Sequence, residues 1–247
     1  MIYREPLISR IEDFTPEWDY TASAILKALE NIADRHHSIV AAEEGTADLL
    51  PGYIWLLTEW RVEIPRTPTR EDKLTLETWV VDTGIGPRTT REVRIVDDHG
   101  AVFALAHLQF SAYNAAEHKK LILSNTYIPR YDTEEKGVFD GELPRLTMPK
   151  EFEAQRSLSV RRADIDYNNH VHNVAYLDYA LEMLSDDEAH IRNIAGYRID
   201  YFRSLKYGDK VTLRRAAGQG FIRVGMYSGG QLACIVEFDI RLSLIHI

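Results

Sequence analysis

The 247-residue sequence is poor in cysteine and has no long apolar run. With a single cysteine it cannot form an internal disulfide, which fits a reducing compartment such as the cytosol. No apolar stretch approaches the roughly 18 residues that a membrane-spanning helix needs. The first residues lack the basic segment followed by an apolar segment that marks a secretory signal peptide. We therefore expect a cytoplasmic protein with no membrane span.

Positive charge is also scarce. Lys and Arg number 29 against 38 Asp and Glu, which gives a formal net charge of −9 at pH 7. A protein this acidic is a poor general binder of nucleic acid or of anionic membranes. Hydrophobic residues make up 45% of the chain and charged residues 27%, as in folded globular proteins. The length allows one large domain or two small ones.

The first half of the chain predicts one long helix and several antiparallel strands. Residues 22–43 place Ile25, Leu29 and Ile32 near a period of 3.6, which is typical of a helix with one buried face. Runs of β-branched and aromatic residues, separated by turn-like segments, predict strands at 2–11, 53–64, 73–81, 89–96 and 102–113. The predicted order is one strand, one helix and four strands.

The second half repeats this order of elements. The segment NVAYLDYALEML, at 173–184, is apolar nearly all round, so it predicts a helix that is mostly buried. One buried helix followed by a meander of strands predicts a sheet wrapped around a helix, which is the hotdog arrangement. Strands are expected at 152–161, 196–202, 210–217, 221–227 and 232–242.

We therefore predict an α+β fold, a tandem (double) hotdog in which each half has a long central helix wrapped by an antiparallel sheet. Parallel α/β folds fit poorly because only one helix per half alternates with the strands. The expected domains are an N-terminal hotdog at 1–130, a proline-interrupted linker at 131–150, and a C-terminal hotdog at 151–247 that carries the candidate catalytic loop.

A short polar loop precedes the second helix. Residues 161–174 read RRADIDYNNHVHNV and put Asp166, Asn168 and His170 at every second position. In an extended loop these side chains would point the same way. A carboxylate, an amide and an imidazole on one side could activate water or attack an acyl carbon.

The start of the second helix adds to this candidate site. A helix beginning near Asn173 and Val174 would direct its free backbone N–H groups at an oxyanion. The competing interpretation is an Asx-rich turn that only caps the helix, which is a common use of Asn and Asp.

The segment from Asp164 to Tyr176 reads DIDYNNHVHNVAY. It resembles the acyl-acyl carrier protein thioesterases, whose plant members have a segment much like DLDxNxHVNNVKY. The first half adds IWLLT at 54–58 and ETWV at 77–80, which resemble the family's IWxxT and DTWV. The resemblance runs in order along nearly the whole chain and suggests a bacterial relative of the plant enzymes.

The resemblance implies a tandem hotdog that hydrolyses the thioester joining a fatty acyl chain to the phosphopantetheine of the carrier, as part of fatty acid biosynthesis. The family's catalytic residues carry over as Asp166, Asn168 and His170. No metal or other cofactor is expected, because the family is metal-free.

One position departs from the family pattern. A Glu on a strand after the helix joins the family's catalytic set, but Ser204 stands there, followed by Leu205 where the plant enzymes often have Cys. Ser204 could hold a water but cannot act as a carboxylate base. Asp166 would then carry that role alone or with Asp200. The lone Cys234 alternates with apolar residues and is expected in the core, not as a nucleophile.

The implied partner is an acyl carrier protein, which is acidic and would need a local basic patch on this acidic chain. An acyl-CoA thioesterase on the same fold and a non-catalytic acyl- or carrier-binding protein are the alternatives, and Ser204 favours the second of these. Both a monomer and a homodimer are compatible with the sequence. The candidate carrier-binding residues are Arg161, Arg162, Lys119, Lys120, Arg203 and Lys206.

Overall fold

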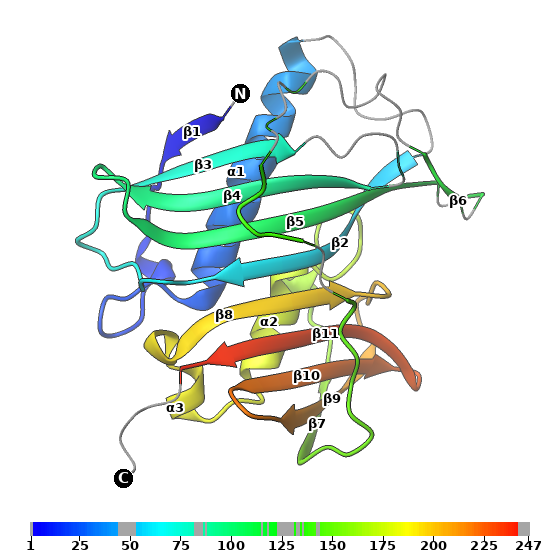
Figure 1. Ribbon diagram of the computed structural model, residues 1–247. Helices are drawn as coiled ribbons and strands as arrows, with labels where there is room; N and C mark the ends of the chain where they lie inside the picture. Colours follow the sequence, from blue (N-terminus) through cyan, green and yellow to red (C-terminus); the bar gives the residue numbers. More distant parts are fainter. Residues whose placement is uncertain are drawn as a thin grey trace. The chain divides into compact units, whose positions relative to one another are not determined.

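The chain folds into two units in the computed structural model (Figure 1). One unit comprises residues 1–20 and 24–141, and the other comprises residues 21–23 and 142–247. The division at residue 142 falls inside the predicted linker. The structure describes residues 2–43, 53–81, 86, 88–114, 116–117, 119–122, 131, 134, 136–141 and 144–241.

In the first unit, helix α1 (Ala22–Glu43) runs across one face of an antiparallel sheet (Figure 1). Hydrogen bonds join the strands in the order β1-β3-β4-β5-β2, and the short β6 pairs with β5. The strands are β1 (Tyr3–Pro6), β2 (Tyr53–Glu63), β3 (Leu74–Val81), β4 (Thr89–Asp97), β5 (Val102–Asn114) and β6 (Lys119–Lys120).

The core of this unit forms where α1 meets the sheet. Ile25, Leu29 and Ile32 of α1 are fully buried, as are Val93 and Ile95 on alternate positions of β4. The helix predicted at 22–43 from its 3.6-residue period is therefore confirmed. No helix within the described parts of the chain is long and apolar enough to cross a membrane.

The first predicted strand is shorter than the sequence suggested. β1 ends at Pro6, while Ile8 and Ile11 are 80% and 71% exposed. A 3-10 turn, Ile11–Asp13, begins instead, and the Asp13 carboxylate accepts a hydrogen bond from Arg10 N at 2.7 Å. The strand predicted over 2–11 is thus wrong beyond residue 6, because a side chain caps the backbone locally.

The second unit contains helix α2 (Asn173–Leu181), a short helix α3 (Asp186–Ala189) and a five-stranded antiparallel sheet (Figure 1). Hydrogen bonds order the strands β7-β9-β10-β11-β8, which repeats the order of the first unit strand for strand. The strands are β7 (Ala154–Ser159), β8 (Ile194–Tyr201), β9 (Lys210–Ala217), β10 (Phe221–Ser228) and β11 (Gln231–Ile240).

Helix α2 is buried nearly all round, as predicted, but it is not long. It has nine residues and ends at Leu181 instead of Leu184. Met183 N donates a hydrogen bond to Ala180 O at 3.0 Å, and Leu184 N donates one to Leu181 O at 3.1 Å. Both bonds span three residues and tighten the chain after the helix. Ser185 and Glu188 then form the capping box of α3. The prediction of a long central helix is therefore wrong for the second half.

We expect Leu177→Ala to lower the free energy of unfolding by about 2–5 kcal/mol, because it leaves a cavity around a fully buried position of α2. Urea denaturation followed by circular dichroism measures this change. Ile8→Ala is the control, since Ile8 is 80% exposed and should shift the value by less than about 0.5 kcal/mol. Equal effects of the two substitutions would contradict the placement of α2 in the core.

Candidate active site

The polar loop between β7 and α2 folds into a tight turn. Ile165 and Val171 form an isolated antiparallel bridge at its base, and Asp166 N donates to His170 O at 2.8 Å. Asn169 has a φ of 59°, the left-handed region that Asn tolerates better than most residues. The expectation of an extended loop is therefore wrong, because the chain reverses between Asp166 and His170.

The Asp166 carboxylate is held by the backbone of its own turn. Its Oδ1 accepts hydrogen bonds from Asn168 N at 2.8 Å and from His170 N at 3.2 Å. In the part of the chain that the structure describes, no hydrogen bond reaches Oδ2. Asp166 and His170 are half-buried at the two ends of the turn, whereas Asn168 is exposed and Tyr167 is 92% exposed near its tip. The turn thus fixes one carboxylate oxygen and leaves the other for a ligand or a water.

Asp164, two residues earlier, anchors the turn. Its buried carboxylate accepts hydrogen bonds from Arg161 N at 2.8 Å, Arg161 Nη2 at 2.7 Å and the Tyr179 hydroxyl of α2 at 2.6 Å. Its carbonyl accepts a bond from His172 N at 2.8 Å. Burial alone would raise the pKa of Asp164, but the hydrogen bonds from Arg161 and Tyr179 outweigh burial and lower it.

Sequence reasoning did not single out this network. Its one local signal was the spacing of Arg161 and Asp164, which form a reciprocal cap around the 3-10 turn Arg162–Asp164. The role of Tyr179 depends on how α2 lies against the loop, and nothing in the sequence alone indicates that contact.

Helix α2 begins where the sequence predicts. His172 is its N-cap, Asn173 and Val174 are its first residues, and Ala175 N donates back to His172 O at 2.9 Å. The Tyr201 hydroxyl of β8 donates to Asn173 O at 3.0 Å and fixes the first turn. The backbone of this turn carries the positive end of the helix dipole. Its use as an oxyanion site stays a prediction.

The loop after β8 lies against the turn. Val171 N donates to Leu205 O at 2.8 Å, and Leu205 N donates to the Tyr176 hydroxyl of α2 at 3.0 Å. Ser204 is exposed and is one residue from this contact. The structure therefore brings Ser204 into the neighbourhood of the turn, and its proposed function as a water-holding group stays a prediction.

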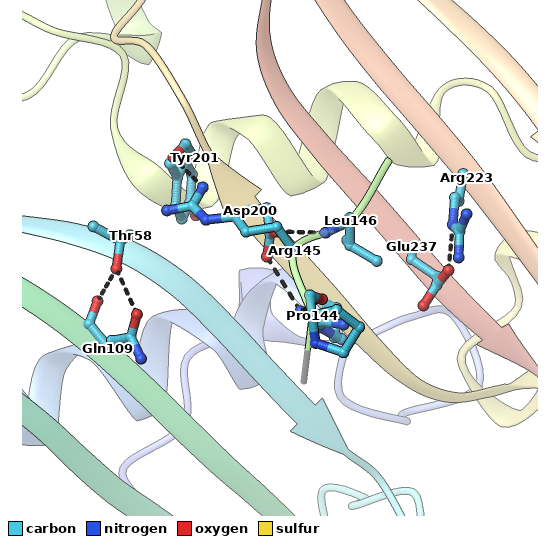
Figure 2. Close-up of polar contacts among 10 residues, drawn as sticks. Thr58, Gln109, Pro144, Arg145, Leu146, Asp200, Tyr201, Arg223 and Glu237 are labelled. Carbon is cyan, nitrogen blue, oxygen red and sulfur yellow. Dashed lines mark hydrogen bonds and ion pairs between the residues drawn. The ribbon is translucent and has the colours of Figure 1, made fainter. Parts of the chain in front are cut away.

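The structure does not bring Asp200 to the turn. Its Oδ2 accepts a hydrogen bond from Leu146 N at 2.8 Å (Figure 2). Its Oδ1 is 3.6 Å from Arg198 Nη2. Side chains alternate along β8, and the adjacent Tyr201 reaches Asn173 of α2, so Asp200 faces away from α2. Burial raises the pKa of this carboxyl. Asp200 thus holds the segment around Leu146, and an auxiliary function beside Asp166 stays a prediction.

Cys234 lies in the core as predicted. Its side chain is fully buried on β11, and burial raises the pKa of the thiol well above its usual range, which makes it a poor nucleophile. Among the residues that the structure describes, no group of three or more His, Cys, Asp and Glu side chains could hold a metal ion.

The predicted carrier-binding cations separate into two sets. Two of them, Lys119 and Lys120, form β6 in the first unit. The other four belong to the second unit and either precede the turn or follow β8, namely Arg161, Arg162, Arg203 and Lys206.

The first unit contains a second copy of the turn. Phe14 and Tyr20 form the bridge at its base, and Thr15 N donates to Asp19 O at 2.8 Å. Trp18 has a φ of 65° where the other copy has a left-handed Asn. The 3-10 turn Ile11–Asp13 precedes it, just as Arg162–Asp164 precedes the copy in the second unit.

The two copies differ in side-chain chemistry. Thr15 stands where the second unit has Asp166, and Asp19 stands where it has His170. The Thr15 Oγ1 is buried and has no hydrogen-bond partner among the residues that the structure describes. The carboxylate and imidazole pair is therefore present in the turn of the second unit and not in that of the first.

We expect Asp164→Asn to lower the free energy of unfolding at neutral pH by about 1–3 kcal/mol, because Arg161 and Tyr179 lose a charged acceptor. The folded-state pKa of Asp164 lies below its unfolded value, so its contribution is complete above the unfolded pKa of about 3.9 and is lost as pH falls through the lower folded pKa. The difference from wild type should therefore shrink as pH falls from about 5 to about 2.

Urea titrations across this pH range test the expectation. Asp98→Asn is the matched control, because the Asp98 side chain is 75% exposed. A stability difference for Asp164→Asn that does not change with pH would rule out the ionised network.

The candidate site lies in a segment that is similar to a known protein family. The model of the acyl-ACP thioesterase C-terminal domain matches residues 148–240. The chloroplastic oleoyl-acyl carrier protein thioesterase of Coriandrum sativum is 27% identical over 232 residues, which cover 85% of this chain and 61% of that protein. The chain thus spans about three fifths of the length of this curated relative.

Solved structures share the fold of the whole chain. An acyl-ACP thioesterase from Bacteroides thetaiotaomicron has a TM-score of 0.82 and 18% identity, covering 97% of this chain and 98% of that one. A 12:0-ACP thioesterase from Umbellularia californica has a TM-score of 0.85 and 18% identity, covering 97% of each chain. These likenesses confirm the predicted tandem hotdog fold. The match of residues 148–240 to the acyl-ACP thioesterase C-terminal domain agrees with the family that the sequence resembles.

Proposed function

We propose that this protein is a thioesterase that hydrolyses fatty acyl-acyl carrier protein to free fatty acid and carrier protein. The observation that carries the proposal is the Asp166 carboxylate, which two backbone amides hold at the base of a tight turn directly before a buried helix. The turn lies within the segment that the family model matches. The names of the relatives support the acyl carrier substrate.

The proposed reaction uses the turn and the start of α2. Asp166 activates a water or attacks the thioester carbonyl carbon, Asn168 orients it, and His170 polarises the carbonyl or moves a proton. If water attacks, its oxygen joins the acyl carbon as the C–S bond breaks. If the Asp166 carboxylate attacks, the acyl group passes to its oxygen as the C–S bond breaks, and a water then cleaves this anhydride to fatty acid and free Asp166. On both routes the pantetheine sulfur leaves as a thiol after taking a proton. Backbone N–H groups near Asn173 stabilise the oxyanion that forms on the way.

The proposal assigns a minor part to the loop after β8. Ser204 is exposed beside the contact between Leu205 and Val171, so a water on its hydroxyl could reach the turn. Asp166 is then the carboxylate that acts on the thioester. We place the reaction in the cytoplasm and in fatty acid metabolism, and a chain with a single cysteine, which cannot form an internal disulfide, fits a reducing compartment.

We expect Asp166→Asn and His170→Ala each to reduce kcat at least about a hundredfold, because each removes a group that acts on the reacting atoms. Release of free fatty acid from a panel of acyl-carrier thioesters measures this loss, and circular dichroism checks that the fold is kept. Asp98→Asn and His99→Ala are matched controls, since both side chains lie on the surface, 75% and 86% exposed. Near-wild-type rates in either site variant would refute the assignment.

The same assay separates the alternatives. A higher kcat/KM for acyl-CoA than for acyl carrier protein of the same chain would favour an acyl-CoA thioesterase. Binding of the acyl carrier without release at any chain length would favour a binding protein, for which Ser204 in place of the family Glu is the supporting observation.

A further inference from the structure

Resting on the proposed function, we propose that the carrier protein docks its acidic face on a basic surface of the second unit, next to the turn. This surface, here called the docking surface, consists of the cations Arg145, Arg162, Arg203 and Lys206 with the aromatic residues Phe202 and Tyr207.

The cations of the docking surface have no carboxylate partner. Within the described residues, Arg145, Arg162, Arg203 and Lys206 form no ion pair, and all four are exposed. Other arginines of the same unit are neutralised by acidic side chains. These pairs are Arg156 with Glu182, Arg161 with Asp164, Arg215 with Glu188, and Arg223 with Glu237 (the last drawn in Figure 2).

Two of the cations lie over exposed aromatic rings. The Arg162 guanidinium carbon is 4.2 Å from the centre of the Tyr207 ring, and that of Arg145 is 5.0 Å from the centre of the Phe202 ring. Tyr207 is 53% exposed and Phe202 is 39% exposed. Arg145 also donates to Tyr201 O at 3.0 Å at the end of β8 (Figure 2). Aromatic residues and arginines are enriched at protein interfaces and among the residues that contribute most to binding.

The docking surface is fastened to the turn by backbone hydrogen bonds. After the turn, Val171 N donates to Leu205 O at 2.8 Å. Before the turn, Val160 O accepts from Gly208 N at 3.2 Å, and Val160 N donates to Asp209 O at 3.0 Å. The loop that carries Arg203, Lys206 and Tyr207 is therefore held between the two flanks of the turn. A carrier bound here would present its pantetheine arm close to Asp166.

The copy of this arrangement in the first unit provides an internal comparison. There Tyr20 N donates to Pro68 O at 2.9 Å, as Val171 N does to Leu205 O, and Thr69 N donates to the Asp72 carboxylate at 2.8 Å. Lys206 N makes the equivalent bond to the Asp209 carboxylate at 2.9 Å.

Arg66 occupies the place of Arg203 in the first unit, but two of the matching positions differ in charge. Thr69 occupies the place of Lys206, and Ile11 occupies the place of Arg162. The backbone therefore does not require these two cations, because it forms in the first unit without them. Their presence beside the turn of the second unit calls for another reason.

Charge complementarity to an acidic carrier protein explains why Arg162 and Lys206 lie beside the turn of the second unit. The chain carries a net charge of −9, so it repels an acidic protein over most approaches. A group of unpaired cations beside the turn attracts an acidic partner to that place and sets its orientation. Attraction of this kind weakens as salt screens it.

The test is the double variant Arg162→Glu/Lys206→Glu. The matched control is Arg66→Glu/Arg70→Glu in the corresponding loop of the first unit, where Arg70 lies over the Trp18 ring at 4.3 Å, much as Arg162 lies over Tyr207. Both variants change the net charge by the same amount. Kinetics are measured with acyl-acyl carrier protein and with the same acyl chain on pantetheine, at low and high salt.

We expect the site variant to raise KM for the carrier substrate about tenfold or more and to remove most of the salt dependence of KM. Its kcat with acyl-pantetheine should persist, which shows that the turn is intact. The control variant should keep the wild-type KM. Equal KM values in the two variants would overturn the proposal.

Two further outcomes are informative. If wild type releases no fatty acid, the proposed function fails, and fluorescence anisotropy with labelled holo-carrier protein then tests docking alone, since lost affinity in the site variant still supports it. If the site variant instead loses binding to vesicles of anionic phosphatidylglycerol while carrier KM is unchanged, the surface serves a membrane and the proposal is overturned.

Discussion

The buried carboxylate of Asp164 sets the position of the candidate site. A carboxylate removed from water stays ionised only when hydrogen bonds and an opposite charge replace its hydration, and here Arg161 and the Tyr179 hydroxyl supply both. Because the carbonyl of the same residue accepts from His172 N, the entry and the exit of the loop meet at one residue. The seven residues between Asp164 and His172 have little freedom, so the place of Asp166 follows from that of Asp164.

Helix α2 completes this arrangement with two tyrosines. Tyr179 donates to Asp164 before the turn, and Tyr176 accepts from Leu205 N in the loop after β8. Both rings are buried, and their hydroxyls are the polar ends of otherwise apolar side chains. A short helix that is apolar nearly all round can therefore sit in the core and still hold two loops through hydrogen bonds. Phe202, Arg203, Lys206 and Tyr207 of the proposed docking surface lie on the second of these loops, so the proposed substrate capture and chemistry share one support.

The sequence predicts elements well where one period dominates. Ile25, Leu29 and Ile32 repeat at helical spacing with no local competitor, and the structure places α1 at Ala22–Glu43 as expected. Prediction fails where a side chain captures the backbone. Asp13 ends the extended segment after β1, and Ser185 starts α3 before α2 can continue. The expectation of an extended loop was also wrong, because hydrogen bonds to Asp166 fold the loop into a turn.

The polar loop has two interpretations, a turn that caps the helix and a catalytic loop, and the duplicated turn in the first unit bears on both. Thr15 and Asp19 build the same backbone turn in the first unit without the carboxylate and imidazole pair, so the fold does not need Asp166 and His170 at those positions. In the second unit Asp166 also bonds its own backbone, as an Asx turn does, yet it uses only Oδ1 for this purpose. Capping and catalysis are therefore compatible functions of a single carboxylate. The hydrogen bonds to one oxygen fix the orientation of the other, and a fixed carboxylate is what an attack on a thioester requires.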